Sequence, residues 1–196
     1  MSAFGIAAKA VRQNPVSVTG INGVVRASYM KVLPMELAVA RKSAKYNRIG
    51  ISLPNTDILE GEHVLSAGDW YIVANVSRDT HRGRPIRSIS ELVWCSHTDI
   101  LVRRPVSVRD SNSGSIIGDT YTELAQNVKL LFTTFEMMDE GDRGVTVGYW
   151  NLYASKLYGQ WPSETEFTIA GRRYEVDWCR DDMQGVYTYR VTKANR

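Results

Sequence analysis

The chain has 196 residues, of which 24 are lysine or arginine and 21 are aspartate or glutamate, giving a net charge of +3; 43% are hydrophobic. This composition is ordinary for a soluble globular protein, and no apolar run of 18 or more residues could span a bilayer as a helix. We therefore expect no membrane partner. The N-terminus lacks the basic and apolar regions of a secretory signal, so we expect synthesis in the cytoplasm.

Helix is scarce along the chain. Residues 3–13 (AFGIAAKAVRQ) have the spacing of a short amphipathic helix, so we assign 1–13 to an N-terminal segment with helical character. Residues 34–45 fit a helix with Pro34 in its first turn, or a strand or long loop. Residues 122–132 (TELAQNVKLLF) fit a helix or a strand equally well.

Two similar segments of the sequence predict β-hairpins. Residues 69–77 (DWYIVANVS) and 172–180 (RRYEVDWCR) alternate apolar and polar side chains, which is typical of half-buried strands. An Ala-Gly pair precedes each strand, and a loop with Gly83 or Gly185 leads to a return strand that again alternates.

These phrases indicate an internal duplication. Ala67, Gly68, Tyr71 and Val73 align with Ala170, Gly171, Tyr174 and Val176. Upstream, residues 14–24 (NPVSVTGINGV) align with residues 104–114 (RPVSVRDSNSG). Many short strands with regular turns argue for a barrel or sandwich. We therefore predict a mainly β protein with two related small β-barrel or sandwich lobes, long hairpins and little helix, the lobes being residues 14–104 and 105–196.

Cysteine and histidine are few. Cys95 and Cys179 are too few for a disulfide framework and lack metal-ligand spacing, so we expect both to be reduced, half-buried strand residues. The three histidines, at 63, 81 and 97, are not spaced as a ligand pair, and a zinc site needs at least three converging ligands. We expect no metal.

Motifs for catalysis are missing or weak. The sequence contains no GxGxxG, GxxxxGK[ST], GxSxG or HExxH pattern. Residues 96–99 (SHTD) place Ser, His and Asp side by side, but neighbours in an extended chain point to opposite faces. The acidic groups at 139–142 and 181–182 have the composition of turns. We therefore expect no enzyme and no cofactor; an activity lost on changing His97 would favour the opposite.

The densest basic stretch is RDTHRGRPIR, residues 78–87. Its plainest interpretation is a solvated hairpin tip, because charged residues are usually exposed. The functional interpretation is a loop that faces DNA phosphates or an acidic partner, and its candidate contact residues are Arg78, Arg82, Arg84 and Arg87.

Aromatic residues gather in the later strands. They could stack on single-stranded nucleic acid, but basic residues do not interleave tightly with them. Core packing together with protein interfaces, where Trp and Tyr are enriched, is the favoured interpretation. The candidate interface residues are Trp70, Trp150, Tyr153 and Trp161.

Several of these stretches together resemble the head-to-tail joining proteins of tailed bacteriophages, also called head-completion, head-closure or stopper proteins. The resemblance lies in residues 105–115, 121–132 and 167–194, and in 67–99, which is similar to a hairpin of related neck proteins. The paired arrangement departs from the single barrel usual in that family.

The resemblance implies a structural component of the virion neck. It implies a ring of six or twelve identical subunits between the portal or adaptor protein and the tail proteins, with non-specific contact with packaged DNA. One alternative is another connector subunit, such as an adaptor or tail terminator. A second is a nucleic-acid-binding β module whose contact surface is Arg82, Arg84 and Arg87 with Trp70.

Overall fold

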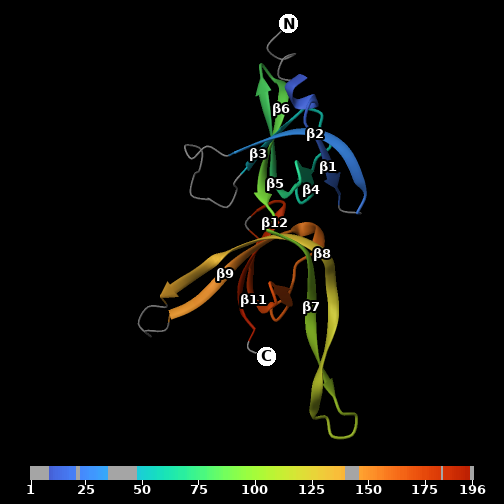
Figure 1. The fold of residues 1–196 in the computed structure, drawn as a ribbon, viewed down its shortest axis with the longest axis vertical. Helices are drawn as coiled ribbons and strands as arrows, with labels where there is room; N and C mark the ends of the chain where they lie inside the picture. The colour runs from blue at the N-terminus through green and yellow to red at the C-terminus, as the bar shows by residue number, and fades with distance from the viewer. Residues whose placement is uncertain (1–8, 21–22, 35–47, 140–145, 182, 195–196) are drawn as a thin grey trace. The chain divides into compact units, whose positions relative to one another are not determined.

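The computed structural model describes residues 9–20, 23–34, 48–139, 146–181 and 183–194, with side chains omitted at 134–139 and 146–147. Figure 1 shows that these residues are almost entirely strands. Two compact units are present: residues 1–95 with 155–157 and 181–186 form the first, and 96–154 with 158–180 and 187–196 form the second.

The first unit contains a closed barrel of six antiparallel strands. In chain order these are β1 (Pro15–Thr19), β2 (Val25–Pro34), β3 (Arg48–Ser52), β4 (His63–Ser66), β5 (Asp69–His81) and β6 (Arg84–Trp94). Their order around the barrel is β1-β2-β3-β6-β5-β4, and pairing of Val18 in β1 with Val64 in β4 closes it.

The second barrel has six strands as well. They are β7 (His97–Arg109), β8 (Ile116–Asp139), β9 (Thr146–Ser155), β10 (Glu166–Ile169), β11 (Arg172–Arg180) and β12 (Val186–Lys193), with a 3-10 turn at Lys156–Tyr158. The order is β7-β8-β9-β12-β11-β10, and pairing of Val102 in β7 with Phe167 in β10 closes the barrel. The predicted fold class is therefore confirmed.

The two barrels have the same topology, since β1 to β6 recur in the same order as β7 to β12. Their backbones agree in detail: Val73 donates to the carbonyl of Glu62 at 2.9 Å, and Val176 donates to that of Thr165 at 2.8 Å. A bulge follows Val73 in one barrel and Val176 in the other. Shared irregularities of this kind identify the barrels as repeats of one unit, because bulges are specific structural features and not defects.

Turn residues explain the shared hairpins. Ala67-Gly68 and Ala170-Gly171 form two-residue loops with positive φ at both positions, between 48° and 92°. Such loops match the twist of paired strands and need residues that tolerate positive φ.

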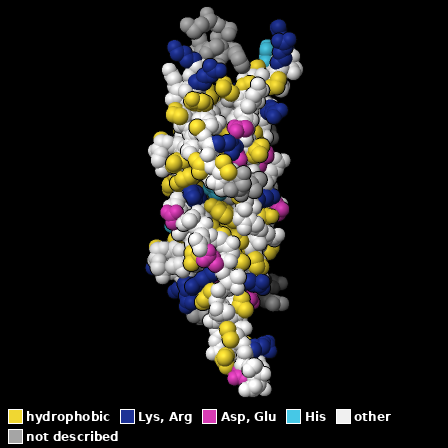
Figure 2. Space-filling model, turned by 90° about the vertical axis from the view of Figure 1, so that its right-hand side faces the viewer, with side chains coloured by type: hydrophobic (Ala, Val, Ile, Leu, Met, Phe, Trp, Pro, Cys, Tyr) yellow, Lys and Arg dark blue, Asp and Glu magenta, His cyan; other side chains and the backbone are white. Residues whose placement is uncertain are grey.

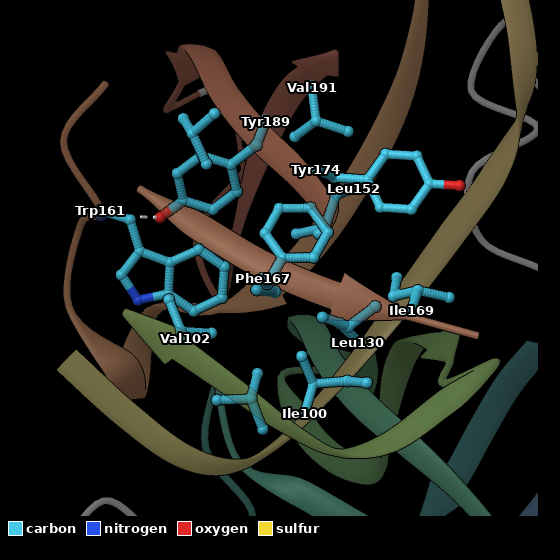
Figure 3. Close-up of a cluster of buried hydrophobic side chains, with 13 residues drawn as sticks. Ile100, Val102, Leu130, Leu152, Trp161, Phe167, Ile169, Tyr174, Tyr189 and Val191 are labelled. Carbon is cyan, nitrogen blue, oxygen red and sulfur yellow. Dashed lines mark hydrogen bonds between the residues drawn. The ribbon is translucent and has the colours of Figure 1, made fainter. Parts of the chain in front are cut away.

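Each barrel encloses its own core. Equivalent positions hold Val18 and Val102, Val64 and Phe167, Tyr71 and Tyr174, Val73 and Val176, and Leu92 and Val191, all buried. The second core, drawn in Figure 3, contains more buried residues and more aromatic rings than the first.

The predicted alignment of residues 14–24 with 104–114 is wrong. Val18 and Val102 hold the same place, because they pair with the equivalent residues Val64 and Phe167. The second PVSV string instead lies beyond the barrel wall, where Val106 and Val108 are 43% and 40% exposed. Similar local sequence misled the alignment because strand propensity does not specify which strand is the partner.

The predicted lobe boundary between Arg104 and Pro105 is also displaced. It falls inside β7, which pairs with β8 of the second barrel from its first residue and with β10 at Val102 and Arg103. The chain passes from the first unit to the second after Cys95.

The structure also tests the predicted helical segments and the two cysteines. Residues 122–132 are strand, within β8. Residues 9–12 form a helical turn, whereas the rest of the predicted helix at 1–8, and almost all of the 34–45 segment, lie outside the described residues. Cys95 and Cys179 form no disulfide. Cys179 is a half-buried strand residue of β11 as predicted, whereas Cys95 is buried and lies just after β6, outside a strand.

Candidate interaction surfaces on two hairpin arms

Each barrel has a hairpin that extends past its wall at a place where the other barrel has none. We call residues 77–88 of β5 and β6 the basic arm, and residues 104–122 of β7 and β8 the β7–β8 arm. At the equivalent places the other barrel has only short connections: β1 and β2 are joined across residues 20–24, and β11 and β12 across 181–185. The arms therefore distinguish the two repeats within the described residues.

The basic arm carries all four predicted arginines on its exposed surface. Arg82 and Gly83 form its two-residue tip, with φ of 51° and 75°. Arg87 donates from Nε to Asp79 Oδ2 at 2.8 Å across the two strands. Arg78, Arg82, Arg84 and Arg87 are all exposed, and Asp79 is the single carboxylate between 77 and 88. The arm presents a concentrated positive charge.

The tip of the β7–β8 arm is held by its own hydrogen bonds. Asp110 Oδ1 accepts from the amides of Asn112 and Ser113 at 2.7 and 2.9 Å, and Gly114 follows with φ of 69°. The Ser113 amide, and then that of Asn112, lower the pKa of Asp110, because these bonds favour the ionised carboxylate. The loop is thus an ordered turn that closes the two strands.

The root of the same arm is tied to the barrel wall. The Arg103 guanidinium lies 3.8 Å from the centre of the Tyr121 ring, a cation–π contact between β7 and β8. Arg103 also faces buried Glu166 of β10 at 3.8 Å. Farther out, Ser107 donates to Asp119 across the strands at 3.1 Å. These contacts preorganise the arm.

Exposed apolar side chains gather on β7 and β8. Of the thirteen large hydrophobic residues exposed in the described part of the chain, seven lie there: Leu101, Val106, Val108, Ile116, Ile117, Tyr121 and Leu124. Figure 2 shows such side chains on the narrow extension at its lower end. An isolated two-stranded ribbon is marginal in water, so apolar side chains displayed on one favour a partner surface.

Two of the predicted interface aromatics are core residues. Trp161 is 2% exposed and stacks on Tyr189, their ring centres 4.9 Å apart; its amide donates to the Tyr189 hydroxyl at 3.1 Å (Figure 3). Tyr153 is 3% exposed. A side chain buried within its own chain offers no surface to a partner, so both assignments are wrong.

Trp70 and Trp150 are half-buried, the latter packed on Phe132 and Tyr174. The exposed tryptophans are instead Trp94 and Trp178, at 38% and 48%. Arg180 lies 5.7 Å from the Trp178 ring. Sequence reasoning missed Trp178 because the β11 bulge changes the alternation of the strand at this point.

Ser96, His97 and Asp99 have separate roles. Ser96 Oγ accepts from the Phe132 amide at 2.9 Å and hydrogen-bonds His97 Nδ1 at 2.8 Å. Asp99 is exposed and accepts from Thr98 Oγ1 at 3.1 Å. Burial lowers the pKa of His97. The arrangement fastens β7 to β8 at the start of the second barrel.

Within the described ranges, no group of three or more His, Cys, Asp or Glu side chains could hold a metal ion. No helix among the residues placed by the structure is long and apolar enough to cross a membrane.

Comparisons with known proteins leave the family open. No known protein family matches the chain, and a search of curated proteins found no match.

Proposed function

We propose that this chain is a structural protein of the tailed-bacteriophage neck, in which a ring of copies connects the portal or adaptor protein to the tail around the DNA channel. The observation that carries the proposal is the presence of two closed barrels in one chain, each bearing a long exposed hairpin arm. The barrels supply rigid bodies and the arms supply contact surfaces.

Closed barrel walls have no free strand edges, so a neighbouring chain cannot add a strand to them. The arms differ, because their outer edges present backbone groups to which a neighbouring chain can add a strand. Contacts between unlike surfaces on successive copies close into a ring when the rotation permits. Rigid barrels combined with arms that can pair with a neighbouring copy support a repeating assembly.

The charge of the basic arm supports a place beside DNA. Four exposed arginines on a short hairpin would neutralise phosphates without reading sequence, as suits a channel through which any genome passes.

The direct test is to image phage particles that lack this protein. The proposal predicts filled heads without tails, or heads that have lost DNA, and restoration of infectious particles when the protein is supplied in trans. Tailed, infectious particles made without the protein would exclude the neck. Tails of abnormal length with intact heads would instead indicate the tail-terminator alternative.

A second candidate, a nucleic-acid-binding module, is favoured by the basic arm alone. In that case the isolated chain would bind duplex DNA with an affinity that falls steeply with salt. Replacing Arg82 and Arg84 by serine would then weaken binding and reduce the salt slope by about two. Binding unchanged by this double substitution would exclude the arm as the DNA contact, and a matched pair, Arg172→Ser with Arg173→Ser on β11, controls for net charge.

A further inference from the structure

Charge is segregated between the two edges of the β7–β8 arm. The β7 side, residues 103–109, has three arginines and no acid. The β8 side, residues 116–123, has Asp119 and Glu123 and no base. Arg104, Arg109, Asp119 and Glu123 are all exposed.

Both outer edges are without a strand partner in the part of the chain that the structure describes. β10 pairs with β7 only at Val102 and Arg103, and β9 pairs with β8 only from Leu130 onward. Charged residues on an edge can serve simply to discourage unwanted pairing. Charges of either sign on both edges would prevent pairing. Opposite charges on the two edges instead favour pairing of the basic edge of one arm with the acidic edge of another.

Strand direction fits the same arrangement. β7 runs toward the tip of the arm and β8 runs back. If the arms lie parallel to the ring axis, neighbouring arms point the same way, and the β8 edge of one copy meets the β7 edge of the next in antiparallel orientation. A continuous antiparallel sheet can then pass from arm to arm.

The positions of the charged residues along the length of the arm are also compatible with pairing between copies. Within one arm Arg104 lies opposite Thr122, next to Glu123, and Asp119 lies opposite Ser107, two residues from Arg109. Rotation about a ring axis parallel to the arm changes no heights. Side chains alternate between the two faces of the ribbon, and Arg109, Asp119 and Glu123 share one face. Asp119 of one copy therefore comes within reach of Arg109 on the adjoining edge of the next copy, because two residues of strand span about 7 Å.

We propose that the β7–β8 arms of successive copies pair edge to edge, the basic β7 edge of one copy against the acidic β8 edge of the next. The inference rests on the proposed ring and names the surface that forms it. Pro105 has no amide proton to donate, so the shared ladder runs over Val106 to Arg109. The β-branched side chains of Val106, Val108, Thr120 and Thr122 then cover one face of the shared sheet.

The test is a charge swap in the full chain, with self-association measured by analytical ultracentrifugation at low salt over a range of concentrations. One variant carries Arg104→Glu with Arg109→Glu, a second carries Asp119→Lys with Glu123→Lys, and a third carries all four changes. The control is Arg82→Glu with Arg84→Glu on the basic arm, which changes net charge as much as the first variant. Circular dichroism checks that each variant is folded.

We expect the wild-type chain to associate and each single-edge variant to associate at least tenfold more weakly, because like charges on facing edges oppose pairing. The four-residue variant should recover association to within about threefold of the wild type, because the swap restores charge complementarity. The basic-arm control should associate as the wild type does. A monomeric wild-type chain, no recovery in the four-residue variant, or equal loss in the control would overturn the inference.

The two proposals fail separately. If phage lacking the protein form normal necks while the purified chain shows this charge dependence, the proposed function is wrong and arm pairing stands. If necks are defective but the charge variants assemble normally, another surface forms the ring.

Discussion

Trp161 and Trp178 occupy opposite environments in the second barrel. Trp161 is 2% exposed and stacks on Tyr189 at an interplanar angle of 16°, whereas Trp178 is 48% exposed on β11. Burial in the core raises the pKa of the Tyr189 phenol, and the hydrogen bond that its hydroxyl accepts from the Trp161 amide acts in the opposite direction without cancelling the effect of burial. The two residues form a matched pair for measuring what the aromatic core contributes.

We expect Trp161→Ala to lower the free energy of unfolding by about 3–5 kcal/mol, because it removes a large buried ring and leaves a cavity. Trp178→Ala should cost less than about 1 kcal/mol. Urea unfolding of the full chain, followed by far-UV circular dichroism, measures both. Equal effects from the two substitutions would contradict the assignment of Trp161 to the core.

His97 is a second residue whose surroundings have a measurable consequence. Its pKa is lowered by burial, so the folded state favours the neutral ring relative to the unfolded state. The stabilisation that follows is fully present above the unfolded pKa of about 6.5 and is lost as pH falls through the lower folded pKa.

We therefore expect the melting temperature of the second barrel to rise with pH from about 5 to 7.5, and His97→Asn to flatten this rise, since it removes the titrating ring. His81→Asn, at an exposed site on the basic arm, is the control. A pH profile that His97→Asn leaves unchanged would show that other groups produce the dependence. Differential scanning calorimetry across this range makes the measurement.

Among the elements, the two Ala-Gly turns have the same backbone conformation in both barrels. Ala67 and Ala170 have φ of 52° and 48°, a region that costs a residue with a Cβ roughly 1–2 kcal/mol. Asn tolerates it better and is strongly preferred before Gly in such loops. The turns therefore hold similar strain at equivalent positions.

Ala67→Asn and Ala170→Asn should each raise the free energy of unfolding by about 0.5–1 kcal/mol, and by similar amounts, because the loops are equivalent. Ala27→Asn, at an exposed position inside β2, should give no gain, since Asn is disfavoured in strands. Urea unfolding of the three variants tests this. A stabilising Ala27→Asn would argue for a general effect of Asn and not for relief of positive φ.

For the molecule as a whole, the two repeats are not simply consecutive in sequence. The first unit includes residues 155–157 and 181–186 from late in the chain. In that unit Gly185 donates to the Ala74 carbonyl at 2.9 Å and accepts from the Lys156 amide at 3.1 Å. A Cβ at Gly185 would collide with the Val73 carbonyl oxygen and the Gly61 amide nitrogen, both backbone atoms.

Gly185→Ala should therefore destabilise the first unit by about 3 kcal/mol, because backbone cannot move aside as a flexible side chain can. Hydrogen exchange should show lost protection at the Gly61 and Val73 amides. Gly118→Ala, where nothing lies within 4 Å, is the matched control and should be neutral within about 0.5 kcal/mol. Unchanged protection at those two amides would contradict the predicted collision.

The sequence alone was sufficient for the elements whose signal is local. Alternation in 69–77 and 172–180, with Ala-Gly before each strand, indicates both hairpins, and both form as β4–β5–β6 and β10–β11–β12. The exposure of the four predicted arginines also followed, because charge avoids burial wherever the hairpin lies. The chemistry of the side chains and the period of the backbone determine these features residue by residue.

Only the tertiary structure decided which strands are partners. Two PVSV strings of equal local character occupy different places, one in a barrel wall and one on an exposed arm, because closure pairs Val102 and not Val106 with β10. Trp161 likewise became core through Tyr189, far along the chain. Hydrogen bonding between distant strands and packing against distant side chains carry no local sequence signal. Only the tertiary structure therefore shows how each barrel closes.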